Sequence, residues 1–223
     1  MLSENGNSEV GDKVRSKSLD PRRINIHMSE IMSVNAQDIE IPFELTSKDF
    51  LDFASEDLKG QSIRNTVNAL SNIKRSIDCL FDSLLFAVDF LEDSKRERWT
   101  FPAKMTFLSE IGIITPYILG RINSFRNLLE HEFRKPDRSE VETAYDVATL
   151  LFSATFRFTR RFYDFLDISL EYEGQPIALE IQIHEDRTIH ISNHRQNLTV
   201  KWSENPENYK EWLKVIYAAF TID

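Results

Sequence analysis

The longest regular pattern of hydrophobic positions lies in the first half of the chain. From Gln61 to Glu92, apolar residues recur at three- and four-residue steps, which predicts one long amphipathic helix. The apolar positions are Ile63, Val67, Leu70, Ile73, Ile77, Leu80, Phe81, Leu84, Leu85, Val88 and Leu91. Residues 1–22 are polar and show no period, so we expect a mobile tail there.

Three shorter signals flank this helix. The alternating stretch INIHMSEI, starting at Ile24, predicts a strand, and KDFLDFASEDL after Thr46-Ser47 predicts a short capped helix. Thr115-Pro116 supplies an N-cap hydroxyl followed by a proline at the first helical position. The helix that begins there should end before Pro136, because the residue preceding a proline avoids the α region.

The last third of the chain changes its period. Ser139-x-x-Glu142 predicts a capping box opening a helix over residues 140–165. After Phe165, the segments ISLEYEG, IALEIQIH and TIHIS alternate and predict an antiparallel meander. A final amphipathic helix is expected over residues 206–220.

These elements predict a mainly α protein with a small antiparallel β element, an α+β chain in which a helical bundle precedes a β-meander and a C-terminal helix. We expect four parts in chain order. They are a polar tail at 1–22, a strand and short helix at 23–60, a helical domain at 61–165, and the meander with the last helix at 166–223.

Composition narrows the class of protein. The 223 residues contain one cysteine, Cys79, which excludes an internal disulfide framework and is typical of a reducing compartment. There is no apolar run long enough to span a bilayer and no secretory signal pattern at the start, so we expect a cytoplasmic protein without membrane contact.

Charge is distributed unevenly. The formal net charge of -9 argues against a protein that coats nucleic acid by bulk attraction. The acidic excess lies at the two ends, however, because residues 115–165 hold 8 basic and 7 acidic residues. Local charge decides whether an anion can dock, so the middle of the chain could still bind a phosphate.

One stretch in this middle region, RNLLEHEFRKP, combines residues suited to phosphate chemistry. Asn127 and His131 are four residues apart and would share a helix face, and the long side chain of Arg126 can reach the same edge. Pro136 places His131 in the last turn, where the helix dipole and two flanking glutamates should raise its pKa above the usual value of about 6.5.

A histidine that exchanges protons and an arginine that binds phosphate are the minimum set for metal-independent RNA cleavage. The 2′-hydroxyl of RNA supplies the nucleophile, but one histidine cannot be acid and base in the same step. The chemistry therefore predicts a composite site across a homodimer.

The Arg126-Asn127-x3-His131 string, in a predicted helical region of residues 61–165, resembles the HEPN superfamily. The resemblance implies a metal-independent endoribonuclease without cofactors, of the kind found in toxin–antitoxin and anti-phage systems, with Arg126 and His131 catalytic and Asn127 supporting them. It also implies an RNA substrate, a homodimer, and an antitoxin or regulatory protein as partner. One toxin branch carries a tyrosine two residues after the histidine, where this chain has Phe133.

Further basic residues could bind the RNA backbone. Arg121, Arg134 and Lys135, with Arg138, could form a rim around the motif, whereas Arg157, Arg160 and Arg161 lie among aromatic residues that could stack on bases. The competing interpretation of the second group is an aromatic core stripe with outward-pointing arginines.

One alternative function stays open. Arg126 could pair with Glu130 and His131 could merely cap the helix end, which would leave a non-catalytic HEPN-like interaction module that binds through the β element and the last helix. His184, His190 and His194 match no standard zinc spacing, so we expect no metal site.

Overall fold

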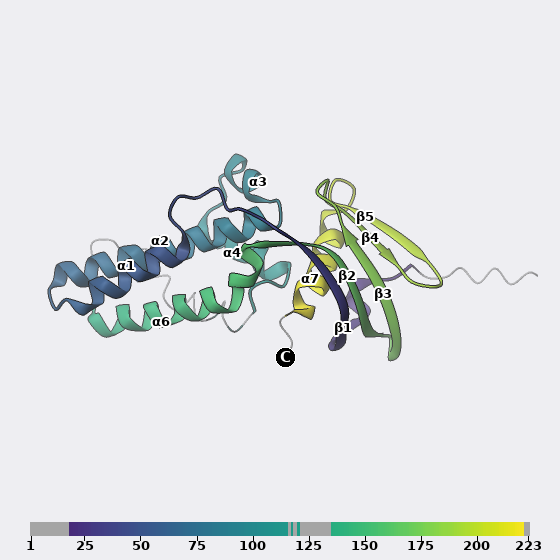
Figure 1. The fold of residues 1–223 in the computed structure, drawn as a ribbon, viewed down its shortest axis with the longest axis horizontal. Coiled ribbons are helices and arrows are strands. Elements are labelled where there is room, and N and C mark those ends of the chain that lie inside the picture. The colour runs from purple at the N-terminus through teal and green to yellow at the C-terminus, as the bar shows by residue number, and fades with distance from the viewer. Residues whose placement is uncertain (1–17, 116, 118–119, 121–134, 221–223) are drawn as a thin grey trace, which may run out of the picture.

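The fold is described from a computed structural model, in which residues 18–115, 117, 120 and 135–220 are placed. It is an antiparallel sheet with a large helical insertion between its first two strands (Figure 1). The strands are β1 (Ile24–Asp38), β2 (Arg161–Tyr172), β3 (Gln175–Ile183), β4 (Thr188–Ser192) and β5 (Asn197–Lys201), and they pair in chain order.

The expected order, a helical bundle followed by a small meander, is wrong. A strand of the sheet, β1, precedes the helices in the chain. It pairs antiparallel with β2, with Ile24 opposite Tyr172 and Asp38 opposite Arg161. The β element is therefore a five-stranded sheet built from both ends of the chain. Local periodicity could not reveal this pairing, because the partners of β1 lie more than 120 residues away in the sequence.

The sheet has one buried and one solvent-facing side. Alternate residues of β2 and β3 are buried, among them Leu166, Ile168, Leu179 and Ile181, while their neighbours are exposed or half-buried. Helix α7 (Pro206–Ala219) contacts β1 and β5 and buries its own apolar face, so that it covers this inner side. The last helix was expected, and it is confirmed.

Helices between β1 and β2 form the other half of the molecule (Figure 1). They are α1 (Ser47–Lys59), α2 (Ile63–Ala87), α3 (Leu91–Arg96), α4 (Phe101–Glu110) and α6 (Arg138–Thr155), followed by the 3-10 helix η2 (Phe156–Thr159); a further short one, η1 (Pro21–Arg23), precedes β1. The predicted cap at Thr46 is confirmed, because its hydroxyl accepts from the Asp49 amide and the Asp49 carboxylate accepts in return.

The long helix predicted up to residue 92 ends at Ala87. Asp89 then takes a positive φ of 62°, which redirects the chain so that Phe90 turns inward. The Phe90 ring packs 4.6 Å from the Phe107 centroid and 4.7 Å from that of Trp202. Burial of these rings is favourable enough to override a continuing helical pattern.

The helix predicted over residues 140–165 is also shorter than expected. It begins at Arg138 with Asp137 as its cap, not Ser139, because the Asp137 carboxylate accepts from the Ser139 amide at 2.9 Å and the Glu140 amide at 3.4 Å. It ends at Thr155, and strand β2 has already begun at Arg161.

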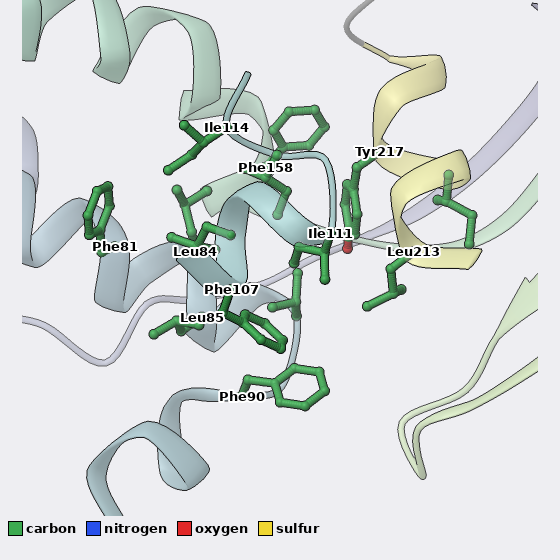
Figure 2. Packing of buried hydrophobic residues seen from close by; sticks show 14 of the residues in the cluster. Phe81, Leu84, Leu85, Phe90, Phe107, Ile111, Ile114, Phe158, Leu213 and Tyr217 are labelled. Atoms are coloured by element: carbon green, nitrogen blue, oxygen red, sulfur yellow. The ribbon is translucent and has the colours of Figure 1, made fainter. Parts of the chain in front are cut away.

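One continuous hydrophobic core joins the helical half to the sheet half. Figure 2 shows Leu84, Ile111 and Ile114 from the helical half beside Phe158 and, from α7, Tyr217. The rings of Phe158 and Tyr217 meet edge to face at 5.5 Å. The two halves therefore share side chains in a single cluster, which fixes their mutual position.

Candidate functional site

The predicted catalytic residues Arg126, Asn127 and His131 lie outside the described residues, as do Arg121 and Arg134. The structure does describe residues on both sides of them. Ile113 and Ile114 are buried in the common core on one side, and Pro136 is buried on the other. The described chain on either side of the motif is therefore packed into the molecule.

Two basic residues of the predicted rim, Lys135 and Arg138, lie within the described part of the chain. Lys135 is exposed to solvent. Arg138 is instead committed to structure, because its guanidinium donates to the carbonyl oxygens of Leu58 and Gly60, the latter at 2.6 Å, and its Nε lies 2.8 Å from Glu142. Arg138 thus satisfies carbonyls at the C-terminal end of α1, so we remove it from the expected basic rim.

The three arginines expected on one helical edge point to different partners. Arg157 donates to the carbonyl oxygen of Phe220 and lies over the Phe158 ring, whereas Arg161 lies 3.7 Å from the Asp38 carboxylate. Arg160 lies 5.6 Å over the centroid of Phe156. The three side chains point in different directions because α6 ends at Thr155, before the first of them.

Their aromatic neighbours divide into core and surface residues. Phe158 and Tyr163 are buried in the shared core, which agrees with the interpretation as a core stripe. Phe156 behaves differently, because 40% of its surface is exposed. A ring stacked under a guanidinium and open to solvent is suited to binding a flat ligand.

Phe156 and Arg160 lie at a groove of about 630 Å³ in the helical half, close to where the insertion leaves β1 and returns to β2. Its walls come from the chain leaving β1, the start of α1, the C-terminal part of α2, and the α6–η2 junction. The lining residues are Ile39, Glu40, Ile41, Thr46, Ser47, Lys48, Leu80, Ser83, Phe152, Phe156, Thr159 and Arg160. The volume is in the usual range for small-molecule sites.

Most hydroxyl groups in the groove are already used. Thr46 caps α1, Ser47 bonds Ser76 at 2.9 Å, and Ser83 and Thr159 donate to the carbonyl oxygens of Cys79 and Phe156. Lys48 forms an ion pair with Asp52. The charged side chains left for a ligand are those of Arg160 and Glu40, since neither forms an ion pair within the described part of the chain.

Sequence reasoning found Arg160 but missed Glu40 and Lys48. The amide of Ile39 donates to the carbonyl oxygen of Arg160 at 2.9 Å, which brings Glu40 beside the end of η2. No local signal could have found this contact, because it joins the two ends of the helical insertion.

Other reactive residues give weaker candidates. The rings of His184 and His190 touch at 4.9 Å, but the described residues contain no group of three side chains suited to a metal ion. Burial raises the pKa of the Cys79 thiol, which disfavours the reactive thiolate. No described helix has the length and apolar character needed to cross a bilayer.

Comparison of the chain with family models, curated proteins and solved structures gives no match in any of the three.

Proposed function

We propose that this protein is a metal-independent endoribonuclease with Arg126 and His131 as catalytic residues and Asn127 as their polar support. The observation that carries the proposal is the sequence Arg126-Asn127-x3-His131, five residues before Pro136. It combines a guanidinium, which binds phosphate bidentately, with an imidazole, which exchanges protons near neutral pH.

The reaction needs only these groups and the RNA. A base removes the proton of the 2′-hydroxyl, whose oxygen forms a bond to phosphorus while the bond from phosphorus to the 5′-oxygen breaks. An acid protonates the departing 5′-oxygen, which leaves a 2′,3′-cyclic phosphate and a 5′-hydroxyl end. In a homodimer, one His131 would act as the base and the partner copy's His131 as the acid, while the two Arg126 side chains stabilise the charged phosphate.

An RNA-cleavage assay in EDTA tests the proposal. Wild-type protein should cut RNA and leave cyclic phosphate ends, and His131→Ala should lose at least about a hundredfold in rate, the usual contribution of a general acid or base. His194→Ala is the matched control, because it removes an exposed imidazole from the β4–β5 turn. Normal cutting by His131→Ala would refute the assignment.

A second function, a non-catalytic interaction module, is favoured by the solvent-facing side of the sheet. That side carries the acidic residues Asp167, Glu171 and Glu180, which suit a basic partner. The last helix does not belong to such a surface, because the apolar face of α7 is buried, with Trp212 wholly inaccessible. Absence of cleavage by wild type, together with a partner that Glu180→Lys releases, would favour this function.

A further inference from the structure

We infer that the groove beside Phe156 and Arg160 binds one nucleotide of single-stranded RNA and favours a base with an exocyclic amine. This inference rests on the proposed function for the choice of RNA as ligand. It deepens that function by assigning a substrate contact to described residues that are separate from the catalytic motif.

Phe156 supplies the stacking surface. Its ring centroid lies 4.9 Å from that of Phe152, which supports it from α6, and it is 40% exposed, whereas Phe158 and Tyr163 nearby are buried. Bases of unpaired RNA stack on aromatic rings and on guanidinium planes alike. Because the Arg160 guanidinium lies over the Phe156 ring, a base at the groove would stack on the exposed part of that ring or on the outer face of the guanidinium.

Arg160 supplies the charge for a phosphate. Its guanidinium has the Phe156 ring as a partner but no carboxylate within the described part of the chain. Arg157 and Arg161 differ in this respect, because a backbone carbonyl and Asp38 already hold them. An arginine without an anionic partner, at the mouth of a groove, is suited to bind the phosphate attached to a stacked base.

Glu40 supplies the group that distinguishes bases. Glu40 lines the groove, and its carboxylate has no ion-pair partner among the described residues. A carboxylate accepts a hydrogen bond from the amine of cytosine, whereas uracil presents a carbonyl oxygen at the same position and would be repelled. The groove should therefore prefer cytidine to uridine.

The walls of the groove are fixed before a ligand binds. Leu80 on its floor is buried, and the cap at Thr46 and the Ser47–Ser76 pair hold the start of α1. The hydrogen bond from the Ile39 amide to the Arg160 carbonyl oxygen ties the chain leaving β1 to the end of η2. A site on rigid elements loses little entropy when it binds a ligand.

Fluorescence anisotropy with 2′-O-methyl oligonucleotides tests the inference, because these probes cannot be cleaved by attack of a 2′-hydroxyl. An oligo-C probe should bind wild type about tenfold more tightly than oligo-U, the effect expected of one hydrogen bond to a charged group. Phe156→Leu and Arg160→Gln should each weaken oligo-C binding about tenfold. Glu40→Gln should remove most of the preference for C over U.

Matched controls separate a local effect from a general one. Phe53→Leu changes a ring of similar exposure on α1, and Arg64→Gln removes the same charge from the start of α2; both should bind like wild type. Thermal melts verify that each variant is folded. Binding by Phe156→Leu and Arg160→Gln within twofold of wild type would overturn the inference, whereas loss of cleavage in His131→Ala is measured separately and bears only on the proposed function.

Discussion

Arg187 holds the sheet to the helical half, and its removal should destabilise the protein strongly. This residue lies in the β3–β4 turn with a positive φ of 59°. Its guanidinium reaches Asp89 at 3.0 Å and Asp93 at 2.5 Å, and it stacks 4.4 Å over the Phe90 ring. Only 20% of the Arg187 side chain and 12% of the Asp93 side chain are exposed, so this is a largely buried ion pair.

The cost of Arg187→Ala follows from these contacts. Removing one partner of a buried ion pair costs about 3–5 kcal/mol, because the remaining charge stays buried without compensation. Arg96 still contacts Asp93, which places the expected loss near the lower limit, at about 3 kcal/mol. For a domain of this size, such a loss lowers Tm by about 6–12 °C.

Urea unfolding, followed by far-UV circular dichroism and tryptophan fluorescence, measures this loss. Arg195→Ala, at an exposed arginine in the next turn, is the control and should stay within about 0.5 kcal/mol of wild type. In a double-mutant cycle, Arg187→Ala and Asp93→Asn should be coupled by at least about 1 kcal/mol. A loss below about 1 kcal/mol in Arg187→Ala, with no coupling to Asp93, would refute the reasoning.

Two further predictions follow from the same structure. Burial raises the pKa of Asp93, but hydrogen bonds from Arg187 and Arg96 outweigh burial and lower that pKa below its ordinary value of 3.8. The ionised Asp93 carboxylate therefore adds stability above about pH 4, and this stability is lost as the pH falls through the lowered pKa of the folded state. Urea titrations between about pH 5 and 3 should show that the unfolding free energy declines less in Asp93→Asn than in wild type. At the start of α6, Asp137→Ala should lower the unfolding free energy by about 1 kcal/mol, because Asp137 caps the helix. Ser139→Ala should lower it less, and equal losses in the two variants would contradict this assignment.

Local signals in the sequence predicted most individual elements. The Thr46 cap, the apolar stripe of α2, the meander and α7 all appear where their periods and caps indicated. Errors occur where tertiary packing competes with the local pattern. Phe90 turns inward to meet Phe107 and Trp202, and strand pairing with β1 begins at Arg161, inside a stretch with an apparently helical stripe.

The candidate groove shows a similar division. The sequence pointed to Arg160 and to the aromatic residues around it, since basic and aromatic side chains are interspersed there. It could not show that Phe156 is exposed while Phe158 and Tyr163 are buried, because that depends on the turn of the chain after Thr155. It gave no sign of Glu40, which reaches the groove through strand pairing.

Spacing along the chain was enough to predict strands β1 to β4, four of the described helices, and the string of residues on which a ribonuclease can be proposed, but not β5, α3 and α4. These properties depend on neighbours within a few positions, so they can be inferred from spacing. The tertiary structure alone decided that β1 closes the sheet across a helical insertion and that Arg187 joins the two halves. Those contacts connect residues far apart in the chain, and their free energy comes from burial and charge pairing that no local pattern records.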